Sequence, residues 1–186
     1  MRNCHVASID AYNDISTKNE YAVAIDAGCT VEEAMEACYE NSRDNARTPM
    51  QWDDSAQAGF TTGTPWLFVN PNYKEINVVK QEKDPDSILN FYKQLIRLRK
   101  EYPIIVYGSY KLLYPEHKTA FVYERVLENE KLLVACNFSE EELELEVPAE
   151  FVQNSAKLLI SNYPEAGISE KMSLRPYEAR VYRMTK

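Results

Sequence analysis

The sequence has few of the residues that metal sites and disulfide frameworks require. Its 186 residues include four cysteines and two histidines, and no two cysteines form a CxxC pair. Structural zinc needs closely spaced cysteine and histidine ligands, so no metal is expected, and no other cofactor either. The first residues are polar and acidic, which does not fit a secretory signal. We therefore expect reduced thiols in a cytoplasmic protein. The cysteines are Cys4, Cys29, Cys38 and Cys136.

Positive charge and long apolar runs are also scarce. The chain carries 29 acidic and 21 basic residues, which gives a formal net charge of −8. Surfaces that bind nucleic acids are basic, and this chain has no basic run, so neither nucleic acids nor membrane surfaces are expected partners. No apolar run approaches the roughly 18 residues that a membrane-spanning helix needs. The length and a hydrophobic content of 45% predict one or two small globular domains.

The first forty residues predict two short helices with narrow apolar stripes. Residues 16–27 have a helical composition, and Gly28 can adopt the left-handed conformation that ends a helix. Thr30 and Glu33 have the spacing of a capping box, which predicts the start of a second helix. Each helix would bury little apolar surface alone. We therefore expect both to pack on something larger.

Residues 41–80 are predicted to be irregular, because prolines and glycines interrupt them repeatedly. Brief extended pieces are expected at 66–69 and 76–79. Irregular segments of this length are usually functional. A clear helix follows, with Asp84 as its expected N-cap, Pro85 as its first residue and Pro103 as its end. Its apolar stripe comprises Ile88, Phe91, Tyr92, Leu95, Ile96 and Leu98.

From residue 104 onward, short apolar segments alternate with acidic or turn-forming breaks. Residues 141–147 (EELELEV) alternate strictly, which is typical of a strand with one packed and one solvated face. Seven such strands predict an antiparallel sandwich. The fold class is therefore α+β, with a loop-rich helical segment followed by an all-β antiparallel sandwich. The expected strands are 108–114, 120–127, 132–137, 141–147, 156–161, 172–174 and 179–184.

The stretch 41–54 (NSRDNARTPMQWDD) is dense in charged and aromatic groups. Arg43 and Arg47 stand four residues apart, so on a helical turn they would share one face. A guanidinium is a planar fork of donors for carboxylates or hydroxyl pairs, and Trp52 offers a flat apolar face. This mixture suits sugar recognition. The alternative is structural: both arginines would hold the loop down through carboxylates and backbone carbonyls.

The same stretch carries a resemblance to a known family. The run SRDNARTPMQWDD at 42–54 resembles the late part of α-glucosidases of the α-amylase superfamily (glycoside hydrolase family 13), most closely the oligo-1,6-glucosidase group. Dextran glucosidase and trehalose-6-phosphate hydrolase are similar groups. The likeness continues through SILNFYKQLIRLRKEY at 87–102 and LRPYEA at 174–179, and it covers nearly the whole chain from about Ile9 onward.

The resemblance implies a part of an enzyme. Enzymes of this family hydrolyse glycosides with an aspartate nucleophile and a glutamate acid/base held on a (β/α)₈ barrel of roughly 250 residues. In the family these carboxylates lie before the segment matched here. The resemblance therefore implies a C-terminal fragment without catalytic residues. Residues 1–103 would be the end of the barrel, after its last strand, and residues 104–186 the C-terminal β-sandwich.

The resemblance also implies roles for the motif residues. Arg43 is expected to bond a hydroxyl of the non-reducing-end glucose of an α-glucoside oligosaccharide. Arg47 is expected to line the mouth of the pocket or to brace the loop. Asp44, Gln51 and Trp52 are expected to position the loop. Without the rest of the barrel, the surface that would face it is available for self-association.

Two other interpretations stay open. The parent enzyme could act on trehalose 6-phosphate or rearrange sucrose rather than cleave α-1,6 or α-1,4 glucosidic bonds, since the residues that choose the substrate lie mainly upstream. The chain could also be a stand-alone carbohydrate-binding or interaction module, which a sandwich fold permits. The acidic runs at 53–54 and 140–142 are expected to be solvated, because adjacent residues on a loop rarely converge on one bond.

Overall fold

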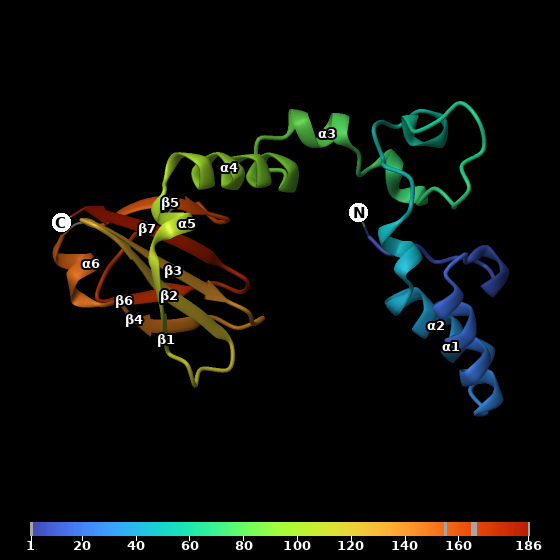
Figure 1. The fold of residues 1–186 in the computed structure, drawn as a ribbon, viewed down its shortest axis with the longest axis horizontal. Coiled ribbons are helices and arrows are strands. Elements are labelled where there is room, and N and C mark those ends of the chain that lie inside the picture. The colour runs from blue at the N-terminus through green and yellow to red at the C-terminus, as the bar shows by residue number, and fades with distance from the viewer. Residues whose placement is uncertain (1, 155, 165–166, 186) are drawn as a thin grey trace. The chain divides into compact units, whose positions relative to one another are not determined.

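The computed structural model describes residues 2–154, 156–164 and 167–185. The chain divides into two compact units, one up to Asn90 and one from Phe91. Helices and loops build the first unit, and a β-sheet domain makes up most of the second (Figure 1). The domain boundary expected from the sequence, after residue 103, lies later in the chain than this division after Asn90, and it stays a prediction.

Two α-helices open the first unit, α1 (Ile15–Asp26) and α2 (Val31–Asn41). The predicted capping box of α2 is confirmed. Thr30 Oγ1 accepts a hydrogen bond from the Glu33 N–H, and the Glu33 carboxylate accepts one from the Thr30 N–H. Gly28 has a φ of +92°, the left-handed conformation expected between the two helices.

Tight turns fill much of the middle of the first unit, as the irregular composition predicts. The extended piece expected at 76–79 is wrong, because Val78–Lys83 forms the helix α3, and residues 66–69 form no strand either. Asn77 starts this helix, since its side chain accepts a hydrogen bond from the Lys80 N–H at 2.9 Å. The 3₁₀ helices of the unit are η1 (Ile9–Ala11), η2 (Arg43–Ala46), η3 (Ala56–Gly59) and η4 (Pro71–Lys74).

The long helix α4 (Ile88–Glu101) is confirmed, but its predicted N-cap is wrong. Ser87 caps it, since the Ser87 Oγ accepts a hydrogen bond from the Asn90 N–H at 3.2 Å. Asp84 instead accepts a hydrogen bond from the Asp86 N–H and closes the turn before the helix. The helix therefore starts later than predicted.

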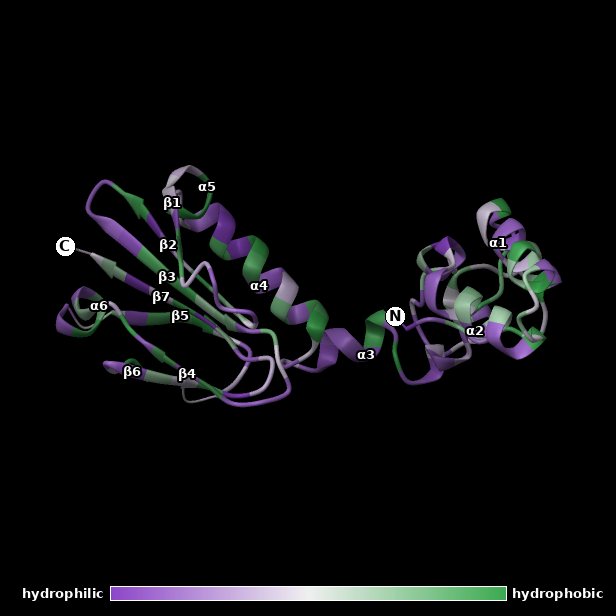
Figure 2. Ribbon diagram, turned by 90° about the horizontal axis from the view of Figure 1, so that it is seen from below, coloured by the Kyte–Doolittle hydropathy of each residue, from purple (hydrophilic) through white to green (hydrophobic). Residues whose placement is uncertain are grey.

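Much of the apolar stripe of α4 is exposed. Ile88 is 81% exposed and Tyr92 is 63% exposed, whereas Leu98 is buried. Figure 2 shows hydrophobic residues recurring among polar ones along this helix. Apolar surface of this kind is typical of a protein contact. No helix in the described part of the chain combines the length and the apolar character that crossing a membrane requires.

Seven antiparallel strands lie in the described part of the second unit, and all seven predicted strands are confirmed. Five form one sheet in the order β1-β2-β3-β7-β5, and β4 pairs with β6 in another. The short helices α5 (Ile104–Tyr107) and α6 (Ala149–Gln153) lie outside the predicted elements. The strands are β1 (Ser109–Leu113), β2 (Ala120–Leu127), β3 (Glu130–Asn137), β4 (Leu143–Glu146), β5 (Lys157–Ser161), β6 (Lys171–Leu174) and β7 (Ala179–Thr185).

A single hydrophobic core joins the two sheets of this unit. The strand register places Val122 opposite Ala135 and Leu133 opposite Tyr182, and all four residues are buried. Phe151 from α6 is fully buried in the same cluster, which also takes residues from β4 and β6. The predicted sandwich is therefore confirmed.

Candidate functional site

The motif stretch folds as a tight turn at the end of α2. Ser42 ends that helix and begins η2, and its Oγ accepts a hydrogen bond from the Asp44 N–H at 3.2 Å. A serine hydroxyl suits such a start, because it offers an acceptor to a backbone N–H that has no helical partner. Arg43 is the first residue of η2, and Arg47 follows its last residue.

Asp44 is the fully buried member of the motif. Its Oδ2 accepts hydrogen bonds from the backbone N–H groups of Asn13 and Asp14, at 2.6 and 2.9 Å. Its Oδ1 lies 3.6 Å from the Arg47 Nη1. Asp44 therefore ties the motif turn to the start of α1.

Asp14 lies at the centre of this cluster. Its Oδ2 accepts hydrogen bonds from the N–H and the Oγ1 of Thr17, at 3.2 and 2.9 Å, and so caps α1. Its Oδ1 accepts hydrogen bonds from the Arg43 Nη2 at 2.7 Å and the Arg47 Nη1 at 3.3 Å. Burial would raise the pKa of Asp14, but the hydrogen bonds from Arg43 and Thr17 outweigh it and lower the pKa to about 2. The carboxylate is therefore charged at neutral pH.

The sequence pattern does not single out Asp14 as a functional residue. Its signal is a modest one, an aspartate placed shortly before a predicted helix, where it reads as a helix cap. Hydroxyl groups complete its surroundings, since the Thr17 Oγ1 and the Ser42 Oγ are hydrogen-bonded at 2.9 Å and both residues are buried. The start of α1 and the motif turn are thus joined by buried polar contacts.

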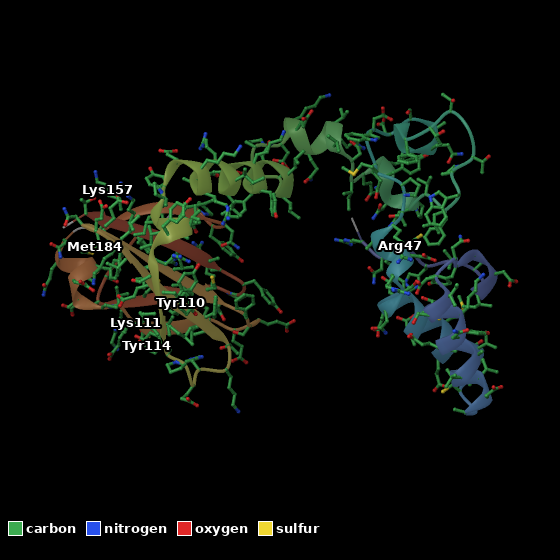
Figure 3. The ribbon with its side chains drawn as sticks, viewed as in Figure 1. Arg47, Tyr110, Lys111, Tyr114, Lys157 and Met184 are labelled. Carbon is green, nitrogen blue, oxygen red and sulfur yellow. The ribbon has the colours of Figure 1, made fainter. Side chains whose placement is uncertain are left out.

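Arg43 and Arg47 meet on this one carboxylate, which agrees with their four-residue spacing. Their side chains are 61% and 44% exposed, whereas that of Asp14 is 4% exposed (Arg47 is labelled in Figure 3). An arginine has five N–H donors, so each guanidinium keeps donors on its exposed side. Together with Asp14 and Asp44 the two arginines form an electrically balanced group. Such a group can offer several donors to a neutral polyol.

Gln51 and Trp52 contact the loop in different ways. Gln51 is 2% exposed, and its Nε2 donates to the carbonyl oxygen of Ile76 at 2.6 Å and to the Asn72 Oδ1 at 2.9 Å. Trp52 is 48% exposed, and its backbone N–H donates to the carbonyl oxygen of Ala58 at 2.9 Å. Gln51 thus holds the loop by its side chain and Trp52 by its backbone.

The acidic runs are exposed or locally bonded, as expected. Residues 140–142 are exposed. The Asp53 Oδ1 accepts a hydrogen bond from the Ser55 N–H at 2.9 Å, and hydrogen bonds from Ser55 lower the pKa of Asp53. A Cβ on Gly59, where φ is +65°, would lie 2.7 Å from the Asp53 carboxylate, so this turn requires glycine. Among the described residues, no three His, Cys, Asp or Glu side chains gather as metal ligands.

Two family matches divide the chain between them. Residues 11–108, which contain the cluster of Asp14, Arg43 and Arg47, match the family described as "Alpha amylase, catalytic domain". The chain belongs to the alpha-amylase family. Residues 110–181 match the "Maltogenic Amylase, C-terminal domain" and contain most of the sandwich. The matches confirm the fold class, the end of a TIM barrel followed by an antiparallel β domain.

Several known alpha-amylase relatives are similar over the whole chain. The oligo-1,6-glucosidase of Parageobacillus thermoglucosidasius is 49% identical over 187 residues, 99% of this chain and 33% of the relative. The crystal structure of Bacillus licheniformis trehalose-6-phosphate hydrolase matches with a TM-score of 0.92 at 40% identity, covering 100% of this chain and 34% of that one. The isomaltulose synthase of Klebsiella sp. LX3 matches with a TM-score of 0.84 at 37% identity, covering 98% and 33%. The chain therefore spans about a third of the length of these relatives.

Proposed function

We propose that this chain is the C-terminal portion of an α-glucosidase that cleaves α-1,6 or α-1,4 glucosidic bonds at the non-reducing end of short oligosaccharides. In this role Arg43 bonds a hydroxyl of the terminal glucose, and Arg47 lines the mouth of the pocket. One observation carries the proposal: a buried carboxylate holds both guanidinium groups while their outer sides stay exposed. Exposed donors in a fixed position are what hydroxyl recognition needs.

The bond-cleaving carboxylates belong to another part of the longer protein in this proposal. Retaining glycosidases use two carboxyl groups about 5–5.5 Å apart, and one of them must be protonated to act as the acid. Asp14 cannot fill that role, because its pKa is lowered to about 2 and its oxygens are bonded to Thr17 and the two arginines. Asp44 is fully buried and holds backbone N–H groups.

The first test uses the isolated chain. Purified chain, incubated with isomaltose and with an aryl α-glucoside, is expected to release no glucose above a mock purification. Calorimetry with malto- and isomalto-oligosaccharides is expected to show no binding, because one wall of a pocket lacks most of its contacts. Turnover would overturn the assignment of catalysis elsewhere, and tight binding would favour the stand-alone carbohydrate-binding module.

The second test uses the full-length enzyme that carries this chain. Arg43→Ala is expected to lower kcat/KM for glucosides about 100-fold, because a site built around a substrate hydroxyl loses its donor. Arg97→Ala, which removes an exposed arginine of α4, serves as the control and is expected to leave kcat/KM unchanged. A wild-type kcat/KM for Arg43→Ala would remove Arg43 from the pocket.

The substrate class proposed is an α-glucoside, and a panel of substrates resolves it further. Oligo-1,6-glucosidase is the name of the relative at 49% identity, so isomaltose is expected to be turned over fastest. Trehalose 6-phosphate and sucrose belong in the panel because a trehalose-6-phosphate hydrolase and an isomaltulose synthase share this fold. Faster turnover of either substrate would replace the main proposal by that alternative.

We further propose that the enzyme works in the cytoplasm. All four cysteines are free thiols in the structure, and Cys4 and Cys38 are buried without a disulfide. Fractionation of cells expressing the tagged full-length protein is expected to place the α-glucosidase activity in the cytosolic fraction. Activity in the culture medium or the membrane fraction would overturn this location.

A further inference from the structure

A buried carboxylate lies behind the two exposed arginines of the motif. The Asp14 Oδ1 accepts hydrogen bonds from the Arg43 Nη2 and the Arg47 Nη1, at 2.7 and 3.3 Å. The Asp14 side chain is 4% exposed, while those of Arg43 and Arg47 are 61% and 44% exposed. One buried oxygen therefore holds the inner edges of two guanidinium groups.

Asp14 is itself fixed from three sides. Its N–H donates to the Asp44 Oδ2 at 2.9 Å, and its Oδ2 accepts hydrogen bonds from the N–H and Oγ1 of Thr17. The Thr17 Oγ1 also contacts the Ser42 Oγ at the start of η2. All of these residues are buried. A shift of the Asp14 carboxylate would break several of these bonds, so its direction is set by the fold.

We propose that Asp14 is a positioning residue of the sugar site, which holds the Arg43 guanidinium in the orientation that bonds a substrate hydroxyl and keeps Arg47 beside it. The inference rests on the proposed function, because it requires Arg43 to meet the substrate. A free arginine has many rotamers and loses that freedom when it binds a ligand. A guanidinium already held by a buried carboxylate has lost that freedom before the substrate arrives. The negative charge also offsets the repulsion between two guanidinium groups that share one oxygen.

The decisive variant, made in the full-length enzyme, is Asp14→Asn. Asparagine is as good an N-cap as aspartate, so the start of α1 is retained while the negative charge is removed. We expect Asp14→Asn to lower kcat/KM for glucosides about tenfold and Arg43→Ala to lower it about 100-fold. The double variant is expected to be no worse than Arg43→Ala alone, because Asp14 acts through Arg43. Asp10→Asn, an exposed aspartate on η1, is the matched control and should keep the wild-type value.

A rescue experiment separates positioning from a general effect on folding. Guanidinium ion at tens of millimolar is expected to raise kcat/KM of the Arg43→Ala variant about tenfold, because Asp14 can hold the free ion in the place that the side chain has left. It should restore nothing in the double variant Arg43→Ala, Asp14→Asn. If Asp14→Asn lowers the melting temperature, Asp14→Ser repeats the experiment with another favourable cap that also lacks the charge.

The outcomes distinguish the two proposals. If Arg43→Ala keeps wild-type kcat/KM, the proposed role of the motif in sugar binding is overturned. If Arg43→Ala is impaired but Asp14→Asn is not, the Asp14 inference is overturned while the proposed function stands. Equal guanidinium rescue with and without the Asp14 carboxylate overturns the Asp14 inference in the same way.

Discussion

The Glu178 Oε1 accepts a hydrogen bond from the Arg180 Nε at 2.7 Å inside the sheet unit, where Glu178 is fully buried and Arg180 is 7% exposed. The Glu178 Oε2 also accepts a hydrogen bond from the Arg175 N–H at 2.8 Å. Removing one member of a buried pair leaves the other charge without compensation, at a cost of about 3–5 kcal/mol. Glu178→Ala is therefore expected to destabilise the second unit by about this amount. Urea denaturation followed by far-UV circular dichroism measures the change.

A surface ion pair in the same unit provides the control for this prediction. Lys171 and Glu144 lie 3.1 Å apart, but their side chains are 68% and 64% exposed. Exposed pairs contribute roughly 0–1 kcal/mol, so Glu144→Gln should leave the urea midpoint nearly unchanged. Tryptophan fluorescence does not report on this unit, because Trp52 and Trp66 lie in the first one. Equal destabilisation by both variants would show that burial does not decide the cost.

The same glutamate predicts how the stability of the second unit depends on pH. Burial would raise the pKa of Glu178, but hydrogen bonds from Arg180 and Arg175 outweigh it and lower the pKa from 4.5 to about 2. A group with a lowered folded-state pKa stabilises the fold above its unfolded pKa, and that stability is lost as the pH falls. We expect a loss on the order of 2 kcal/mol between about pH 4.5 and pH 2. Urea midpoints measured at pH 7, 4 and 3 check this. In Glu178→Ala the contribution of this carboxylate is gone, so the urea midpoint should fall less between pH 7 and pH 3.

The sheet could be predicted because each strand carries its own signal. In the run 141–147, Leu145 and Val147 are buried while Glu144 and Glu146 are exposed, so the alternation in the sequence is the alternation of the two faces. The segment 120–127 is similar, and β2 (Ala120–Leu127) has the predicted bounds. The alternation of apolar and polar residues within one segment is therefore enough to predict such a strand, without information on the rest of the fold.

Contacts between residues far apart in the chain could not be predicted from the local sequence pattern. The spacing of Arg43 and Arg47 predicts that they lie together, but their shared partner Asp14 stands 29 positions before Arg43. The N-cap of α4 shows the same limit. Asp84 and Ser87 are both favourable caps, and the Ser87 Oγ is also held by a hydrogen bond to the carbonyl oxygen of Gln81. Tertiary contacts decide which cap forms.

Gln51 and Trp52 are neighbours with different expected costs of substitution. Gln51 is buried, and its side chain donates to Ile76 and Asn72, so Gln51→Ala leaves two partly buried acceptors unsatisfied and is expected to cost about 1 kcal/mol locally. Trp52 is half exposed and holds the loop through its backbone, so Trp52→Ala should cost less. Limited proteolysis at the same protease concentration measures the rate of loop cleavage in both variants. Faster cleavage of Trp52→Ala than of Gln51→Ala would contradict the assignment.

Hydrogen exchange is expected to differ between the two units. The second unit has one continuous core, whereas several of the buried apolar side chains of the first are as small as those of Ala34, Cys38 and Ala58. Few buried apolar contacts mean a low free energy of local opening. Amides of α1 and α2 should therefore exchange faster than those of β2, β3 and β7 in the isolated chain. Equal protection in α1 and β3 at all protein concentrations would contradict this.

The exposed stripe of α4 is expected to drive self-association of the isolated chain. Ile88, Tyr92 and Ile96 follow one another at four-residue spacing, and they are 81%, 63% and 44% exposed. One turn separates neighbours at this spacing, so the three side chains line one face of the helix. Such a face loses contact with water when two copies meet, at about 25 cal/mol per Å² of apolar area.

Sedimentation velocity over a range of concentrations should therefore show the wild-type chain associating. Tyr92→Glu with Ile96→Glu should keep it monomeric, because each glutamate would have to be buried in the contact. Thr62→Glu with Thr64→Glu adds the same charge at exposed loop positions and should associate as the wild type does. If the threonine variant dissociates as fully as the α4 variant, net charge rather than the α4 stripe governs association.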